Sequence, residues 1–125
     1  MIGGVAGGAK GARATTTVIN LKGHIQEFGP RLEKAPADLV YVGRRWTRGG
    51  WDLPEHPLNN PFVPDTAKKK HDGTRAEVMA KYRAYLLERP DLLDLVPELR
   101  DKTLACWCAP ELCHGDILAE LADAS

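Results

Sequence analysis

The stretch that decides the fold is Lys102-Thr103-Leu104-Ala105-Cys106-Trp107-Cys108-Ala109-Pro110-Glu111-Leu112-Cys113-His114-Gly115-Asp116, near the C-terminal end of the chain. Its first part is apolar enough to predict a buried strand over 102–108. A short turn follows, and a helix with an apolar stripe is expected to begin at Cys113 or His114 and to end at Ala122. A strand, a turn and a helix in this order are typical of an α/β sheet.

The rest of the sequence adds two strands and several helical segments. Strands are expected over 15–21 and 38–43, where β-branched and apolar residues lie next to glycine. Thr74-Arg75-Ala76-Glu77 is a capping box and predicts a helix that ends by Arg89, before Pro90. Shorter helical turns are expected within 25–34, from a cap at Asp91 to Val96, and over 97–100. These elements predict one α/β domain, with a small, mostly parallel sheet and helices packed on it.

Composition and charge exclude some classes of protein. The 17 basic and 17 acidic residues cancel, so no bulk attraction to nucleic acid or to a membrane is expected. No apolar run approaches the length of a membrane span. Residues 1–14 are rich in glycine and alanine but lack the order of a signal peptide, so we expect a flexible tail before a single domain over 15–125. Three closely spaced cysteines make a poor disulfide framework, which favours a reducing, cytoplasmic location.

A long irregular loop is expected over 44–73, with basic and aromatic residues at its start. Arg44-Arg45-Trp46-Thr47-Arg48-Gly49-Gly50-Trp51 directly follows the second expected strand. If that strand is parallel to the last one, Arg44 leaves the sheet at the same edge as Cys108, where an arginine suits a phosphate or carboxylate. Trp46 or Trp51 would then stack on a base. The alternative is that the tryptophans only anchor the loop and the arginines are solvated.

The cysteine–histidine segment is the expected place of any chemistry. Ligands of open α/β sheets bind at the C-terminal ends of the strands, and the new helix directs free N–H groups to that edge. A thiolate is favoured at a helix N-terminus, so Cys108 or Cys113 would act as a nucleophile. His114 would serve as acid or base, and Asp116 would orient it.

Two other interpretations of these residues stay open. Cys106, Cys108, Cys113 and His114 together offer a set of ligands that zinc uses, although the spacing C-x-C-x4-C-H is not a standard zinc-finger pattern. Buried cysteine is also common as a small core residue. Because Cys106 and Cys108 share one face of a strand, with Trp107 on the other, packing is the simplest role for Cys106.

Four segments also match a pattern known from other proteins. They are Tyr41-Val42-Gly43-Arg44, Pro57-Leu58-Asn59-Asn60-Pro61-Phe62, Gly73-Thr74-Arg75 with Tyr82, and residues 99–110 with Cys113-His114-Gly115-Asp116. Over roughly residues 15–123 the chain resembles the uncharacterised domain of unknown function 4326 family, found in phages and bacteria, especially actinobacteria. The resemblance implies no established reaction. It does imply that seven positions belong together: Arg44, Asn60, Cys106, Cys108, Cys113, His114 and Asp116.

Two hypotheses about function follow. The first is an enzyme, a thiol- or histidine-dependent hydrolase or transferase acting on a nucleotide-like or other anionic small molecule over the strand ends. Arg44 would hold its phosphate or carboxylate, and Asn60 a polar group. The second is a non-catalytic binding or accessory module, with a structural zinc ion or merely packed cysteines and otherwise no cofactor. Nucleic-acid binding is the weakest interpretation because the net charge is zero, and the sequence does not fix the oligomeric state.

Overall fold

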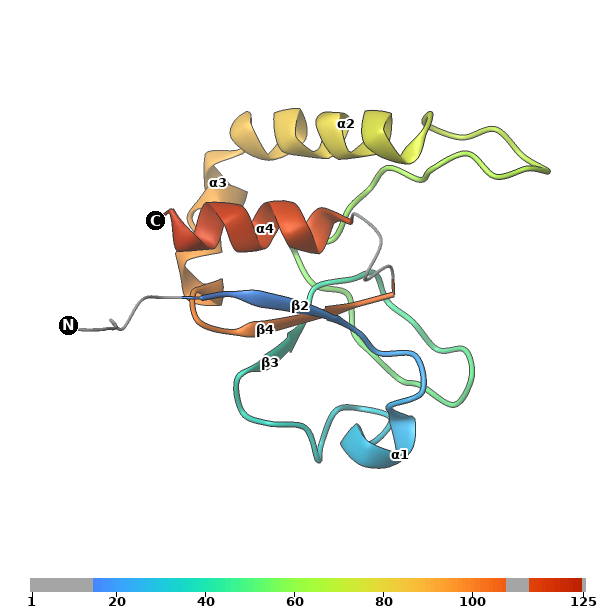
Figure 1. Cartoon of the computed structure of the whole chain (residues 1–125), viewed down its shortest axis with the longest axis vertical. Coiled ribbons are helices and arrows are strands. Elements are labelled where there is room, and N and C mark those ends of the chain that lie inside the picture. The colour runs from blue at the N-terminus through green and yellow to red at the C-terminus, as the bar shows by residue number, and fades with distance from the viewer. Residues whose placement is uncertain (1–14, 108–112, 125) are drawn as a thin grey trace.

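The structure is a computed structural model that describes residues 15–107 and 113–124. Three strands form one parallel sheet in the order β2-β4-β3, so the last strand of the chain lies at its centre (Figure 1). The elements in chain order are β2 (Thr17–Asn20), α1 (Ile25–Phe28), β3 (Leu39–Tyr41), α2 (Arg75–Leu87), α3 (Pro90–Leu93), the 3₁₀ helix η1 (Val96–Leu99), β4 (Thr103–Cys106) and α4 (His114–Asp123). The expected single α/β domain with a parallel sheet is confirmed.

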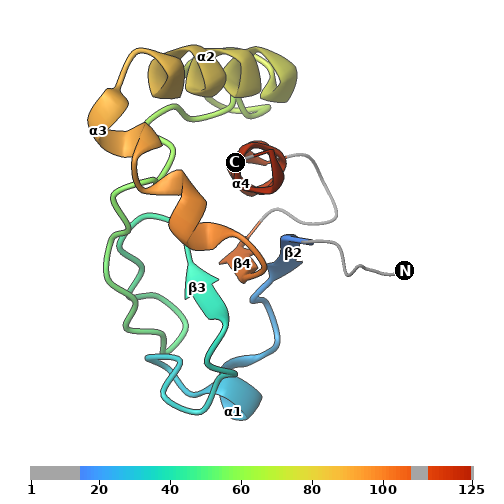
Figure 2. The same ribbon diagram turned by 90° about the vertical axis from the view of Figure 1, so that its left-hand side faces the viewer.

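The sheet is covered on both faces, as parallel sheets require. Helix α4 lies directly on one face and α2 lies on α4, while α1 and much of the 44–73 loop lie below the opposite face (Figure 2). The side chains of β4 alternate accordingly, with Leu104 in the core under α4 and Ala105 in the core above α1. Leu104 and Ala105 are both fully buried, so β4 is the strand on which both cores depend.

Two contacts fix α4 on the sheet. At its N-terminal end, Gly115 lets the helix approach β2, because a Cβ there would lie 3.2 Å from a methyl group of Val18. At the other end, Asp123 accepts hydrogen bonds from the amide and hydroxyl of Thr16, at 3.0 and 2.7 Å. Thr16 is only 7% exposed, so Asp123 satisfies polar groups that solvent hardly reaches.

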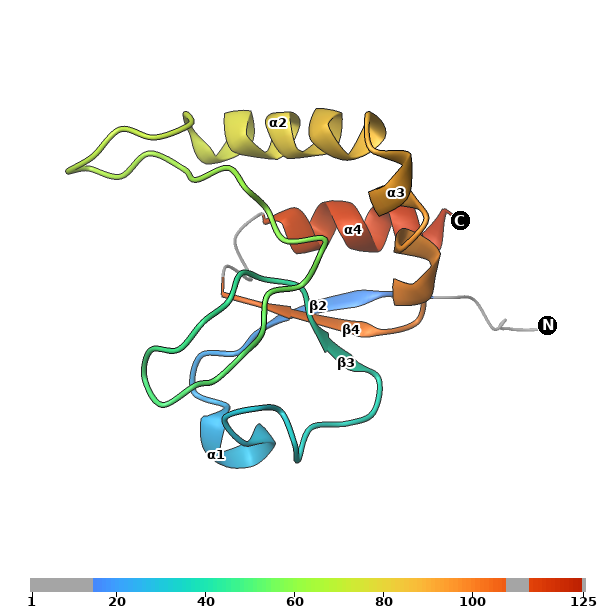
Figure 3. The ribbon, with the colours of Figure 1, turned by 180° about the vertical axis from the view of Figure 1, so that it is seen from behind.

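Helix α2 begins as its sequence predicts. The Thr74 hydroxyl accepts from the Glu77 amide at 3.1 Å, and the Thr74 amide donates to the Glu77 carboxylate at 2.8 Å. The helix ends at Leu87, two residues before the expected limit at Arg89. The loop that precedes α2 runs out from the body of the protein and returns to it, as the view from behind shows (Figure 3).

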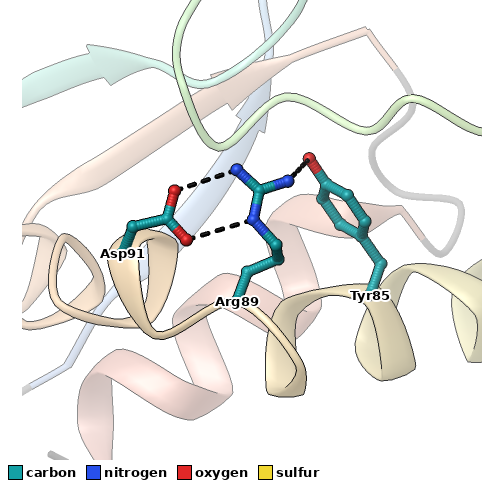
Figure 4. A network of polar contacts seen from close by, with 3 residues as sticks. All are labelled: Tyr85, Arg89 and Asp91. Carbon is teal, nitrogen blue, oxygen red and sulfur yellow. Dashed lines mark hydrogen bonds and ion pairs between the residues drawn. The ribbon is translucent and has the colours of Figure 1, made fainter.

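The segment after α2 corrects one prediction. Asp91 does not cap α3, because Pro90 already occupies the first helical position and Asp91 lies in the first turn. The Asp91 carboxylate instead pairs with the guanidinium of Arg89, which also donates to the Tyr85 hydroxyl at 3.3 Å (Figure 4). Arg89 thus connects the last turn of α2 to the first turn of α3.

The strands are shorter than predicted. β4 ends at Cys106 instead of Cys108, because Trp107 bends away from the ladder and packs against the aromatic residues of the lower core. The 44–73 loop is irregular as expected, apart from an antiparallel bridge between Trp46 and Leu53. The expected tail 1–14 and Cys108 lie outside the described residues. No helix in the described part of the chain is both long and apolar enough to cross a membrane.

Candidate functional site at the strand ends

A pocket of about 210 Å³ opens where β3 and β4 end and α4 begins. Because β3 and β4 are parallel, Arg44, which follows β3, lies at the same edge of the sheet as Cys106, the last residue of β4. The prediction for this edge named Cys108, which lies outside the described residues. The pocket brings together residues from β3, the 44–73 loop, α2, β4 and α4. Its lining comprises Tyr41, Gly43, Arg44, Trp46, Asn60, Val63, Pro64, Arg75, Met79, Cys106, Trp107, Cys113 and His114.

Arg44 lines the pocket and also organises its rim. Its Nε and Nη2 atoms donate to the carbonyl oxygen of Asn60 at 3.0 and 2.9 Å, and Nη2 also donates to that of Phe62 at 3.0 Å. Its Nη1 atom makes no hydrogen bond with the described part of the chain. Arg44 therefore joins the end of β3 to the far part of the loop, and its charge lies at the pocket.

Asn60 is a buried polar residue of the lining, 8% exposed. Its Oδ1 atom accepts from the Phe62 amide at 2.9 Å, which forms a tight local turn. Its Nδ2 group donates no hydrogen bond to any residue that the structure describes. A buried amide donor beside a pocket is a natural contact for an acceptor atom of a ligand.

His114 is held firmly at the first position of α4. Its Nε2 atom lies 2.7 Å from the carbonyl oxygen of Val42 and must carry the proton, since a carbonyl can only accept. Its ring contacts Tyr82 edge-on, with centroids 5.3 Å apart, and is 8% exposed. In the neutral ring Nδ1 is then the basic nitrogen. The nearby His56 has a lowered pKa, chiefly because it is buried and secondly because it lies near His114.

Cys106 and Cys113 meet on the floor of the pocket. Their sulfur atoms are 3.2 Å apart, and the residues are only 2% and 1% exposed. At this distance the two residues are thiols and not the halves of a disulfide. Cys106 ends β4 and Cys113 is the N-cap residue of α4, so the backbone of two regular elements fixes the pair. The structure thus gives Cys106 a specific neighbour beyond its expected packing role.

Two expected site residues take other places, and a third is not described. The Asp116 carboxylate accepts from the Cys113 amide at 2.9 Å, so it caps α4, and it is absent from the described lining of the pocket. Trp51 is 8% exposed and packs edge-on against Trp107 in the lower core, outside that lining. Cys108 lies outside the described residues, and among those described no group of three or more His, Cys, Asp or Glu side chains could hold a metal ion.

Sequence reasoning missed several residues of the lining. Arg75 is the most informative, because it brings a second arginine to the pocket from the first turn of α2. Its position directly after the Thr74 cap could have indicated this role, because a helix N-terminus presents free backbone N–H groups that bind anions. From the sequence, Tyr41 is predicted only as part of the strand over 38–43. Burial raises its pKa, and its hydroxyl donates to the Arg44 carbonyl at 2.6 Å and accepts from the Trp107 indole at 3.1 Å.

The fold and the pocket define a small parallel α/β domain with a site at its strand ends. The chain belongs to the family described as "Domain of unknown function (DUF4326)", whose model matches residues 29–124. It is also similar to the "Uncharacterized protein R718" of Acanthamoeba polyphaga mimivirus, with 37% identity over 90 residues. That alignment covers 66% of this chain and 65% of the viral protein, so this chain spans somewhat less than two thirds of its relative. No solved structure matches the chain.

Proposed function

We propose that the domain binds a small, planar, anionic molecule of nucleotide-like chemistry in the strand-end pocket. The observation that carries this proposal is the lining itself, in which two arginines and three aromatic rings surround a small apolar cavity.

The charge of the lining favours an anion. Arg44 and Arg75 both contribute to it, and the described lining holds no aspartate or glutamate. Arginine is well suited to phosphate and carboxylate groups because its planar guanidinium donates two parallel hydrogen bonds. The N-terminus of α4, where His114 stands, adds a partial positive charge at the same edge.

The shape and surface of the pocket favour a flat ring. Tyr41, Trp46 and Trp107 contribute aromatic surface, and Met79 and Val63 contribute apolar surface. Trp46 and Trp107 lie with ring centroids 5.3 Å apart, so they already form one continuous aromatic wall. At about 210 Å³ the cavity is smaller than the roughly 300 Å³ at which drug-sized ligand sites begin, so it suits one base or similar ring.

Hydrogen bonding supports the same class of ligand. The Asn60 amide is buried at the pocket and its Nδ2 group has no acceptor in the described part of the chain. Heterocyclic bases carry ring nitrogens and carbonyl oxygens that accept from such a group. A ligand acceptor would therefore satisfy a buried donor, which is a source of specificity as well as affinity.

The test is calorimetric titration with three probes: adenosine 5′-monophosphate, adenosine and inorganic phosphate. We expect the nucleotide to bind more tightly than either part. Arg75→Gln should weaken nucleotide binding by about 10- to 100-fold, the cost of one charge-assisted contact. Arg45→Gln removes the same charge from an exposed neighbour of Arg44 outside the pocket lining, and should change affinity by less than about twofold. Equal effects of the two substitutions, or no binding of any probe by folded protein, would refute the proposal.

Catalysis is a second candidate function for the same pocket. Cys113 and His114 both line it, and a thiol and an imidazole are groups that nucleophilic and acid–base catalysis use. A thiol- or histidine-dependent hydrolase or transferase would convert the bound nucleotide. The measurement is product formation from adenosine 5′-monophosphate and its phosphate esters; turnover that persists in a folded His114→Gln variant would remove His114 from this role.

The alternative is an accessory module in which the cysteines hold zinc or only pack. The closeness of the Cys106 and Cys113 sulfurs is compatible with a shared thiolate-binding metal. Elemental analysis of purified protein tests this alternative. One zinc ion per chain, with unfolding on chelation, would favour a structural metal site.

A further inference from the structure

We propose that Cys106 and Cys113 form a reversible dithiol–disulfide site on the floor of the pocket. The observation is geometric. The thiols of Cys106 and Cys113, seven positions apart in sequence, have sulfur atoms 3.2 Å apart, closer than sulfur atoms in ordinary packing contact. A disulfide bond is about 2.05 Å long, so a shift of roughly 1 Å shared between the two side chains would close it.

The placement of the pair favours this reaction. Cys106 is the last residue of β4, at the centre of the sheet, and Cys113 is the N-cap of α4. Both backbones are fixed by hydrogen bonds, Cys106 through the Leu21 amide at 2.9 Å and Cys113 through the Asp116 carboxylate at 2.9 Å. The two thiols are therefore held close together before oxidation, and little chain entropy is lost when they join.

A small oxidant has a route to the pair. Both cysteines are almost fully buried from solvent, yet both belong to the lining of the pocket. Hydrogen peroxide is small enough to enter a cavity of about 210 Å³. Large disulfide reagents are excluded by the same burial, so the site should distinguish oxidants by size.

The reaction balances with a hydroperoxide as the oxidant. The thiolate of one cysteine attacks a peroxide oxygen, the O–O bond breaks, hydroxide leaves, and a sulfenic acid forms. The thiol of the second cysteine then attacks that sulfur as it loses its proton, the S–O bond breaks, and water leaves as the S–S bond forms. In sum two thiols and one hydrogen peroxide give one disulfide and two water molecules. A small dithiol reverses the oxidation by thiol–disulfide exchange.

Oxidation at this position would act on the ligand site, an effect that rests on the proposed function. The disulfide would tie the end of β4 to the start of α4 and remove two thiols from the pocket floor. A nucleotide in the pocket would in turn block the approach of peroxide. The disulfide itself, however, is measured without any ligand, so the failure of one proposal is distinguishable from the failure of the other.

The experiment treats native protein with hydrogen peroxide, removes the peroxide, alkylates the remaining thiols in denaturant, and measures the intact mass. We expect the mass of two hydrogen atoms to be lost, one thiol to be alkylated, and dithiothreitol to restore all three thiols. Cleavage after Lys102 and after Glu111 separates Cys106 and Cys108 from Cys113, so the disulfide should join two peptides.

Single substitutions identify the cysteines and supply a matched control. Cys106→Ser and Cys113→Ser should each abolish the cross-link, whereas Cys108→Ser should leave it intact. Circular dichroism verifies the fold, and alanine replaces serine in any variant that does not fold. A cross-link that survives Cys106→Ser, three alkylated thiols after oxidation, or one bound zinc ion that protects the thiols would each overturn the proposal.

Discussion

The contact between His114 and Val42 offers the sharpest prediction about the framework of the site. The imidazole Nε2 atom donates to the Val42 carbonyl at 2.7 Å, and this bond joins the start of α4 to the end of β3. His114→Leu removes the donor and keeps a side chain of similar bulk. The Val42 carbonyl, on a residue with no exposed surface, then loses the partner that the structure gives it.

The expected cost follows from two contacts. A lost hydrogen bond with a buried unsatisfied carbonyl costs about 1–3 kcal/mol. The edge-on contact of the imidazole with Tyr82, at 5.3 Å between centroids, adds about 0.5–1.5 kcal/mol. The sum is about 1.5–4.5 kcal/mol, which for a chain of this size corresponds to a fall of roughly 6–17 °C in Tm.

Thermal unfolding followed by circular dichroism measures this effect, and urea unfolding gives its free energy. His114→Gln keeps a donor near the position of Nε2 and should recover roughly 1 kcal/mol of the loss. His71→Leu, on an exposed residue of the outer loop, is the matched control and should change Tm by less than about 2 °C. The reasoning is refuted if His114→Leu unfolds at the same temperature as the control variant.

Three further perturbations test the structure around the pocket. Burial and the nearby His114 lower the pKa of His56. The free energy of unfolding should therefore have its full value above pH 6.5, the ordinary pKa of histidine, and should decrease as the pH falls below it. His56→Gln should flatten this pH dependence in urea unfolding. Tyr82→Phe should cost about 1–3 kcal/mol, because the fully buried Tyr82 hydroxyl donates to the Leu58 carbonyl at 2.5 Å. Asp123→Ala should also cost about 1–3 kcal/mol in urea unfolding, since it leaves the amide and hydroxyl of Thr16 without their acceptor.

The substitutions at Tyr82 and Asp123 each have a matched control. Tyr85→Phe removes a hydroxyl that pairs only with the exposed Arg89, and should cost less than about 0.5 kcal/mol. Asp94→Ala removes an exposed carboxylate and serves in the same way for Asp123. An unchanged pH dependence in His56→Gln would show that another group titrates, and equal costs for the two tyrosine variants would contradict the assigned Leu58 contact.

Sequence reasoning recovered the parts of the site that follow from chain direction. Parallel strands end at one edge, so a parallel sheet brings Arg44 after β3 close to Cys113 and His114 after β4. The capping box of α2 was predictable because it is a local pattern of four residues.

The remaining features depend on tertiary packing that no local pattern encodes. Arg75 reaches the pocket only because α2 packs on α4, far from Arg44 in sequence. Trp46 and Trp51 are equivalent candidates in the sequence, yet the Trp46–Leu53 bridge leaves Trp46 at the pocket and Trp51 in the lower core. The meeting of Cys106 with Cys113 likewise requires the helix to return over the strand end.

The central claim is that an anionic planar ligand binds between Arg44, Arg75 and the start of α4. Amide chemical-shift mapping with adenosine 5′-monophosphate on ¹⁵N-labelled protein tests it most directly. We expect the largest shifts on Gly43, Arg44, Asn60 and the first turns of α2 and α4, and we expect adenosine and phosphate each to reproduce only part of them. Saturable shifts confined to another surface, or none at all, would contradict it.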